Sequence, residues 1–166
     1  MKKFVFAISV LTFAMYSCEE KVKETPRSIP SPEKVELLKP DLEKQAEDLK
    51  EKGYQAFLYK EGDSTYLMQQ YYMVFLKAGE NRNQDSTKVA ELQKQHLEHL
   101  SRMAAEGYAS LIGPFGDDGE IRGIVVYQTP TMEMADSLAN LDPMVQAGRL
   151  EVEVHPWWTE KGGKLE

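Results

Sequence analysis

Hydrophobic and polar residues follow two different periods between residues 33 and 70. Over residues 33–52 the apolar side chains recur at intervals of three and four, which predicts a helix with one apolar face. Residues 54–59 and 65–68 are rich in aromatic residues and are separated by a polar segment that contains one glycine, which predicts a β-hairpin. We therefore expect an accessory helix and hairpin in this part of the chain.

A second pattern begins with the continuous apolar run of residues 71–76, which predicts a strand buried on both faces. The pattern after it predicts a long helix over residues 86–106 and two hairpin-connected strands over residues 108–112 and 121–128. A shorter helix from residue 131 onward and a last strand over residues 150–155 follow. The order βαββαβ is that of a ferredoxin-like α+β fold, in which helices cover one face of an antiparallel sheet. We assign this domain to residues 71–157 and a flexible tail to residues 158–166.

Such a domain leaves the other face of its sheet without a helix. The strands predicted at residues 71–76, 121–128 and 150–155 have the highest apolar content and would expose a large apolar surface in a monomer. We therefore expect a homodimer.

The first 17 residues form a separate segment. Two lysines precede an apolar run that is too short for a bilayer-spanning helix of about 20 residues, and this is typical of a signal peptide. The single cysteine of the chain, Cys18, follows directly and leaves no internal disulfide and no thiolate zinc cluster. Residues 18–32 are charged and carry three prolines within seven residues, which predicts a disordered tether.

The residues Met15-Tyr16-Ser17-Cys18 resemble the lipobox of bacterial lipoproteins, in which the thiol receives a diacylglyceryl group before cleavage. The resemblance implies a protein anchored by lipid in the bacterial cell envelope, at the periplasmic face or the outer membrane. Several acyl chains would hold it firmly, because one chain alone gives only marginal membrane binding. The alternative is plain secretory cleavage, which leaves Cys18 as a free thiol.

Composition excludes several classes of protein. The 166 residues are 42% hydrophobic and 28% charged, which suits one globular core and excludes a collagen-like, fully disordered or multi-span membrane chain. The net charge is −7, and removal of the first 17 residues would leave 18 basic against 27 acidic side chains. This balance argues against a nucleic-acid partner, since binding to phosphates requires basic residues.

Two histidines of the predicted long helix are candidates for chemistry. At about 100° per residue, His96 lies in the middle of the apolar stripe and His99 lies at its flank. His96 is then either a hydrogen-bonded core residue or, beside a carboxylate, a general acid or base, because the unperturbed pKa of histidine is about 6.5. Both rings could approach one metal ion, yet no third ligand accompanies them, so we predict no metal and interpret His99 as a solvated flank.

Asp142, directly before Pro143, has two interpretations. It can cap a short turn, or it can accept the second ring proton of His96 and fix the tautomer of that ring. No phosphate-binding glycine pattern is present, and we predict no cofactor.

Aromatic residues could line a pocket for a flat ligand, although strand aromatics commonly belong to the core. The candidates for a substrate pocket are Tyr72, Phe115 and Tyr127. Further strand aromatics that could contribute are Tyr71, Trp157 and Trp158.

Four segments in this order resemble the YCII-related (YciI-like) family of dimeric α+β barrels over about residues 71–157. They are Tyr72-Met-Val-Phe-Leu76, His96-Leu97 with Gly107 eleven positions on, Leu111-Ile-Gly-Pro114, and Leu141-Asp-Pro143 with Ala147-Gly148. The resemblance implies a ferredoxin-like subunit paired into a barrel, with a proposed His-Asp site that falls on His96 and Asp142. Members of the family include a dehydrochlorinase acting on a chlorinated hydroxyquinol, and most others have no assigned activity.

These observations favour a lipid-anchored, cofactor-free enzyme of the lyase or isomerase type. His96 would act as general acid and base, oriented by Asp142, on a small cyclic or aromatic substrate. Elimination and isomerisation need only a proton moved at carbon and a stabilised oxyanion. The alternatives are a non-catalytic ligand-binding or accessory lipoprotein and a structural protein.

Overall fold

The computed structural model describes residues 41–165. The predicted signal peptide, the tether, Cys18 and the first part of the accessory helix lie outside the described residues. None of the helices in the described range combines the length and the apolar character needed to cross a membrane.

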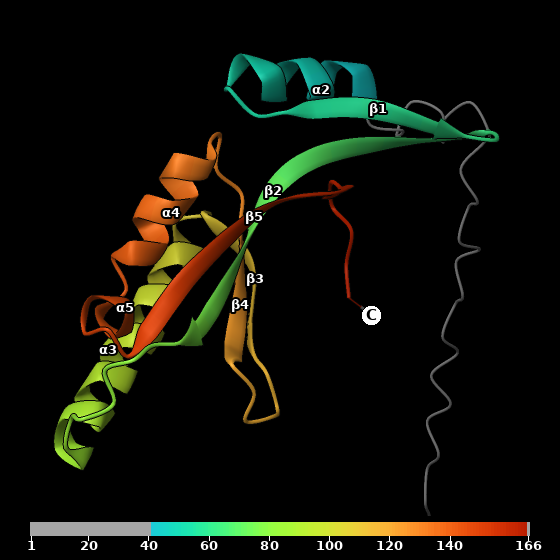
Figure 1. Ribbon diagram of the computed structural model, residues 1–166. Coiled ribbons are helices and arrows are strands. Elements are labelled where there is room, and N and C mark those ends of the chain that lie inside the picture. The colour runs from blue at the N-terminus through green and yellow to red at the C-terminus, as the bar shows by residue number, and fades with distance from the viewer. Residues whose placement is uncertain (1–40, 166) are drawn as a thin grey trace, which may run out of the picture. The chain divides into compact units, whose positions relative to one another are not determined.

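The described helices and strands follow one another along the chain as Figure 1 shows. In order they are α2 (Leu42–Glu51), β1 (Ala56–Glu61), β2 (Ser64–Ala78), α3 (Ser86–Ala105), β3 (Ala109–Pro114), β4 (Ile121–Tyr127), α4 (Met132–Asn140), α5 (Pro143–Gln146) and β5 (Leu150–Glu160).

Strand β2 is the centre of an antiparallel sheet. It pairs with β5 along one edge, and along the other edge with β1 over its first half and with β4 over its second half. Strand β3 pairs with β4, so the main part of the sheet has the order β5-β2-β4-β3. This is the strand order of a ferredoxin-like βαββαβ unit, and the predicted α+β fold class is confirmed.

Helices α3, α4 and α5 cover one face of this sheet (Figure 1). Because side chains alternate along a strand, every second residue of β2 points into the core that these helices close. Members of that core include Val74, Val125 and Tyr127 from the sheet and Leu92 and Met103 from α3. We call the opposite side of the sheet the open face. The side chains that point to it include Tyr71, Met73 and Phe75 of β2 and Val126 of β4.

The accessory helix and hairpin are present. The turn between β1 and β2 is made by two residues, and Gly62 takes a φ of +57°, a left-handed conformation that suits such a turn. Ala46 of α2 packs with Ala56 and Leu67 of the hairpin in a small second core. Leu67 lies on the same side of β2 as Tyr71, so α2 covers the beginning of the open face.

Strand β2 is longer than the pattern predicts. The predicted strands at 65–68 and 71–76 are one continuous strand, in which Gln69 and Gln70 are paired with β5. Gln69 is buried, and its side-chain oxygen accepts a hydrogen bond from Lys161 Nζ at 3.0 Å. The polar pair interrupts the apolar run, but its side chains are accommodated without a break in the ladder.

Strand β5 is also longer than its predicted range of 150–155. Residues 158–160, which we assigned to a flexible tail, pair with residues 68–70 of β2. Pro156 and the two tryptophans after it end the alternating pattern, which is why the sequence indicates an earlier end. A proline is tolerated there because β5 is bonded on one side only, to β2.

Candidate functional site

Helix α3 places His96 between the helices and the sheet. Asp85 caps the helix by accepting a hydrogen bond from the backbone N–H of Lys88 at 2.9 Å. Leu92, Leu100 and Met103 form the buried stripe of this helix, and His96 lies among them with 9% of its surface exposed. The ring therefore faces the protein, as the periodicity predicts.

Asp142 lies at the corner between α4 and α5, with 1% of its surface exposed. Its Oδ1 accepts a hydrogen bond from the backbone N–H of Met144 at 2.8 Å, and Pro143 occupies the first position of α5. Its Oδ2 lies 2.5 Å from His96 Nδ1. Asp142 therefore both caps a turn and contacts His96, because one carboxylate oxygen caps α5 and the other lies against the imidazole.

The contact with Asp142 sets the tautomer of a neutral His96. A carboxylate at Nδ1 keeps the proton on that nitrogen and leaves Nε2 with a free lone pair. Within residues 41–165, Nε2 forms no hydrogen bond. The geometry is that of a base whose proton-accepting atom is available to a ligand.

A cavity of about 220 Å³ lies beside His96, between α3 and the end of the β3–β4 hairpin. Its walls include Leu97 and Leu100 of α3 and Pro114 of β3. Gly123 also lines it, and a Cβ atom there would lie only 2.9 Å from the carbonyl oxygen of Gly113, so the close approach of β3 requires a glycine. A protein cavity of about 150 Å³ holds benzene, so this one has room for a single six-membered ring.

Among the described residues that line this cavity, Arg122 is the cationic one. Its Nη1 donates a hydrogen bond to the carbonyl oxygen of Gly119 at 3.1 Å, and its Nη2 lies 3.6 Å from the exposed carboxylate of Asp118. The sequence pattern does not single out Arg122, since it occupies an ordinary polar position in a strand. The next residue, Gly123, is the one signal in the sequence, because a glycine within a strand often marks a place where another backbone or a ligand approaches closely. In the structure it pairs with Pro114.

The three predicted pocket aromatics do not line the cavity beside His96. Tyr72 and Tyr127 lie opposite each other on the helix-covered face and belong to the core, because their strands turn that side toward α3 and α4. Phe115 is exposed after the end of β3. Burial, and secondly the negative charge of Asp142, raise the pKa of Tyr127, so its hydroxyl stays protonated close to the His96–Asp142 pair.

The prediction that His99 lies on a solvated flank is wrong, because the residue is buried. It has 3% of its surface exposed, because the α4–α5 corner packs against this side of α3. Arg102 Nη2 donates a hydrogen bond to His99 Nδ1 at 3.0 Å, so the ring proton lies on Nε2. That Nε2 is buried, and in the described part of the chain no hydrogen bond of good geometry reaches it. Between residues 41 and 165, no group of three His, Cys, Asp or Glu side chains could hold a metal ion.

Stability should fall when the pH is lowered, in part because of His99. Burial first, and then the charges of Arg102 and His96, lower the pKa of His99 below its ordinary value of 6.5, against the opposing effects of Asp142 and the Leu138 backbone. The unfolded chain therefore binds a proton here at a higher pH than the folded chain does. The contribution of His99 is complete above pH 6.5 and is lost as the pH falls below that value. Urea unfolding at pH 7.5 and 5.5 should show a smaller decrease in His99→Gln than in the native sequence, and an equal decrease would contradict the assignment.

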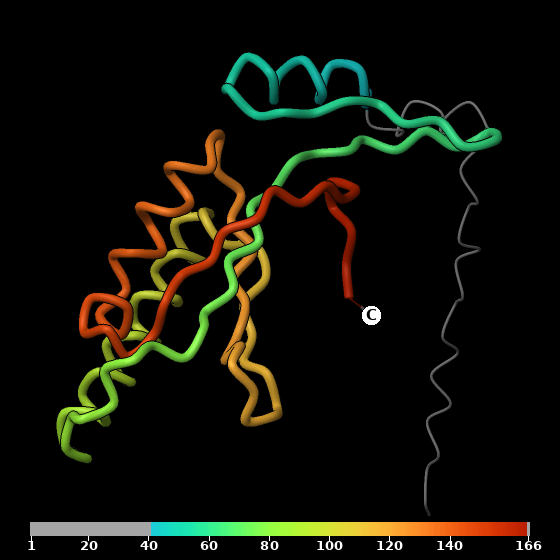
Figure 2. The backbone as a smooth tube through the Cα atoms, in the orientation of Figure 1, coloured from blue at the N-terminus to red at the C-terminus, as the bar shows by residue number. Residues whose placement is uncertain are grey.

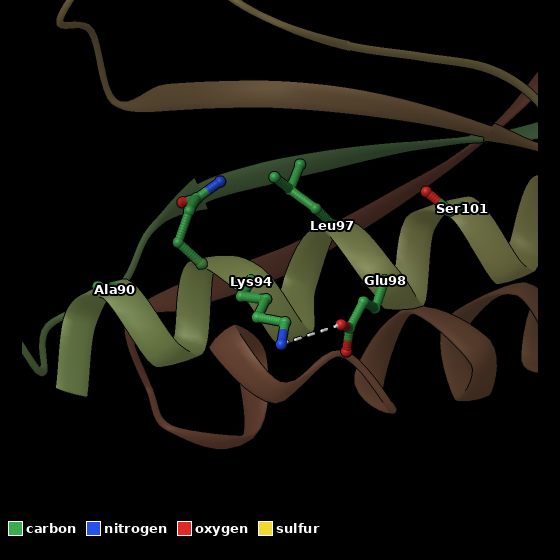
Figure 3. A pocket seen from close by; sticks show the side chains of 6 residues that line it. Ala90, Lys94, Leu97, Glu98 and Ser101 are labelled. Atoms are coloured by element: carbon green, nitrogen blue, oxygen red, sulfur yellow. Dashed lines mark ion pairs between the residues drawn. The ribbon is translucent and has the colours of Figure 1, made fainter. Parts of the chain in front are cut away.

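The outer surface of α3 carries a shallow hollow that Figure 3 shows. Lys94 and Glu98 line it and form an exposed ion pair with each other at 3.8 Å. Gln93 and Leu97 line both this hollow and the cavity of His96. These two side chains therefore separate the His96 cavity from the outer surface of the helix.

One family model, one curated protein and one solved structure are similar to parts of this chain. Residues 70–158 match the model of the YCII-related domain family. An uncharacterized protein of Bacillus subtilis strain 168, YjpA, is 32% identical over 66 residues, which are 40% of this chain and 75% of the relative. Among solved structures, 5-chloro-2-hydroxyhydroquinone dehydrochlorinase from Burkholderia phenoliruptrix AC1100, in complex with 2,5-dihydroxybenzoquinone, matches with 18% identity and a TM-score of 0.41. That match covers 52% of this chain and 92% of the dehydrochlorinase chain.

Proposed function

This chain belongs to the family of YCII-related domains, and from that premise we propose that it is an acid–base enzyme for a small cyclic or aromatic substrate. The observation that carries the proposal is the His96–Asp142 contact of 2.5 Å at a cavity large enough for one ring. A merely structural histidine needs a partner for its ring nitrogen, but it needs no cavity at the other nitrogen.

The chemistry follows from the three polar groups of the site. His96 Nε2 accepts a proton from a ring carbon, and Asp142 stabilises the imidazolium that forms. Arg122, on the wall of the same cavity, stabilises the negative charge that develops on an oxygen of the substrate. His96 then returns the proton to another atom, which gives isomerisation, or the substrate loses a leaving group, which gives elimination.

Two conservative variants test this proposal. A thermal-shift screen of small phenols and cyclic acids identifies a ligand, and deuterium exchange from D₂O into that ligand reports proton transfer at carbon. In His96→Asn and in Asp142→Asn we expect exchange to fall by at least about 100-fold, the lower end of what general acid–base catalysis contributes. Exchange that is unchanged in both variants would reject the catalytic pair.

The same measurements distinguish the alternative of a non-catalytic binding protein. Three results together would indicate that the protein binds a ligand without chemistry. The ligand would bind tightly to the native protein, it would take up no deuterium, and its binding would be lost in Arg122→Gln. Arg122→Lys keeps the charge of the cavity and serves as the matched control.

We further propose that the chain is attached to the bacterial cell envelope by a lipid on Cys18. The support is the position of the single cysteine directly after the apolar segment of the first 17 residues. The variant Cys18→Ala should leave the membrane fraction and lose labelling by a palmitate analogue. Continued labelling would contradict a lipid at this residue.

We propose in addition that two chains pair through the part of the open face that α2 leaves uncovered. Met73, Phe75 and Ile124 are only half-buried in the single chain and lie side by side on that face. Burial of such an apolar patch favours association. Light scattering of a fragment of residues 19–166 should therefore give twice the mass of one chain, and a single-chain mass at micromolar concentration would contradict pairing.

A further inference from the structure

A second cleft, of about 860 Å³, lies on the open face of the sheet and is separate from the cavity of His96. Its floor is formed by Tyr71 of β2, Val126 of β4 and Leu111 of β3. Gln45 of α2 and residues 161–165 also line it. Figure 2 shows that the chain turns back after β5 on its way to the C-terminus. The volume lies within the range of ordinary small-molecule sites.

The cleft offers an aromatic surface to a flat molecule. Tyr71 and Trp157 lie opposite each other on β2 and β5, and their ring centroids are 6.5 Å apart. Both rings line the cleft together with the aliphatic side chains of Leu111 and Val126. Aromatic side chains favour offset or edge contacts with a further ring at such distances.

Lys161 supplies a positive charge at the same place. Its Nζ donates a hydrogen bond to the buried Gln69 side chain at 3.0 Å, which holds the ammonium group at the cleft. Among residues 41–165, no carboxylate forms an ion pair with Lys161, although Glu160 is also on the wall. Burial lowers the pKa of Lys161, as expected for a charge that is partly removed from water without a counter-charge. An anionic ligand would provide that counter-charge.

We propose that this cleft binds a small aromatic anion, with its ring against Tyr71 and Trp157 and its carboxylate or phenolate on Lys161. Gln45 and the residues from 161 onward lie outside the matched family segment of 70–158, so the site is built in part by segments that this chain adds to the domain. Met73 and Phe75, which we assign to pairing between chains, do not line it. Met73 lies next to Tyr71 and Val126 on the open face, so pairing of two chains brings the partner to the edge of the cleft.

Tryptophan fluorescence of the full chain can test the proposal. The chain has two tryptophans. Trp157 lines the cleft, whereas Trp158 does not line it and packs at a tilt against Phe57, with ring centroids 5.0 Å apart. In a Trp158→Phe background, quenching by 4-nitrobenzoate and by its neutral analogue 4-nitrobenzamide compares a charged with an uncharged ring of the same shape. We expect 4-nitrobenzoate to bind at least about tenfold more tightly, because a charge-assisted hydrogen bond is lost with the amide.

Substitutions of lysine decide whether that preference comes from the cleft. Lys161→Met should abolish the preference for 4-nitrobenzoate, and Lys161→Arg should keep it. Lys164 also lines the cleft, but among the described residues no hydrogen bond fixes its ammonium group, so Lys164→Met should keep most of the preference. Lys60→Met, on the exposed strand β1, is the matched control and should change nothing. Equal affinity for acid and amide, or an unchanged preference in Lys161→Met, would overturn the proposal.

Two further outcomes identify other occupants. Quenching that depends on protein concentration and not on ligand concentration would mean that a second copy of the chain fills the cleft, and the proposal would fail. Loss of 4-nitrobenzoate binding in His96→Asn would place the ligand in the His96 cavity and would also overturn this inference, while leaving the proposed function intact. We expect His96→Asn to bind 4-nitrobenzoate with unchanged affinity.

Discussion

Replacement of Asp142 by alanine should lower the free energy of unfolding by about 3 kcal/mol. The substitution removes the acceptor of the Met144 N–H bond, which caps α5, and a lost cap costs about 1 kcal/mol. It also leaves His96 Nδ1 buried without its partner, and an unmet buried polar group costs about 1–3 kcal/mol. Both effects act at one residue because each carboxylate oxygen serves a different neighbour.

Asp142→Asn is the control that separates the two effects. Asparagine caps a helix as well as aspartate does, so α5 should keep its first turn. We expect a loss of about 1 kcal/mol from the weaker bond to His96. Urea unfolding at pH 7.5 measures both variants, and an alanine variant as stable as the asparagine variant would show that the cap contributes nothing here.

Tyr127→Ala should lower the free energy of unfolding by about 3–5 kcal/mol. Tyr127 has 1% of its surface exposed, and its ring packs in the core under α3 and α4. Removal of that ring leaves a cavity that the antiparallel pairs on both sides of β4 prevent from closing. Chemical denaturation should show a lower midpoint with an unchanged slope.

The matched variant Tyr127→Phe keeps the ring and removes only the hydroxyl group. No described side chain forms a hydrogen bond with that hydroxyl, so we expect a change of less than about 1 kcal/mol. A large loss in Tyr127→Phe would reveal that the hydroxyl supports Asp142. A small loss in Tyr127→Ala would contradict its place in the core.

The sequence predicts local features of this protein well. The periods of 3.6 and 2 along the chain give the βαββαβ order and the burial of His96, because both depend on neighbours within a few residues. The caps at Thr131 and Asp142 follow from short-range residue preferences in the same way. These features need no knowledge of how the elements pack together.

Contacts between segments far apart in the chain cannot be predicted from periodicity or from capping preferences. His96 and Asp142 are 46 residues apart, and from the residues alone their contact is only one of two interpretations of Asp142, which the family resemblance favours. His99 is buried by a corner that lies about 40 residues further along the chain. Lys161 meets Gln69 across 92 residues, and neither side chain belongs to a pattern that would indicate the contact. Sequence periodicity specifies which side a residue faces, but not which residue meets it there.

The continuity of β2 has a consequence for how the molecule opens. The hairpin core consists of three buried residues with a few partly buried neighbours, too little to be stable alone. The second strand of the hairpin is nevertheless the first part of β2, on which the main core is built. Within it, Met68 and Gln69 pair with β1 on one side and with β5 on the other. In native-state hydrogen exchange, amides of α2 and β1 should exchange first, through local fraying. The amides of residues 72–77, which lie between β4 and β5, should exchange only when the whole domain unfolds. Strand β2 would then run from weakly protected positions beside β1 to the most protected positions of the sheet, with the boundary near residue 70.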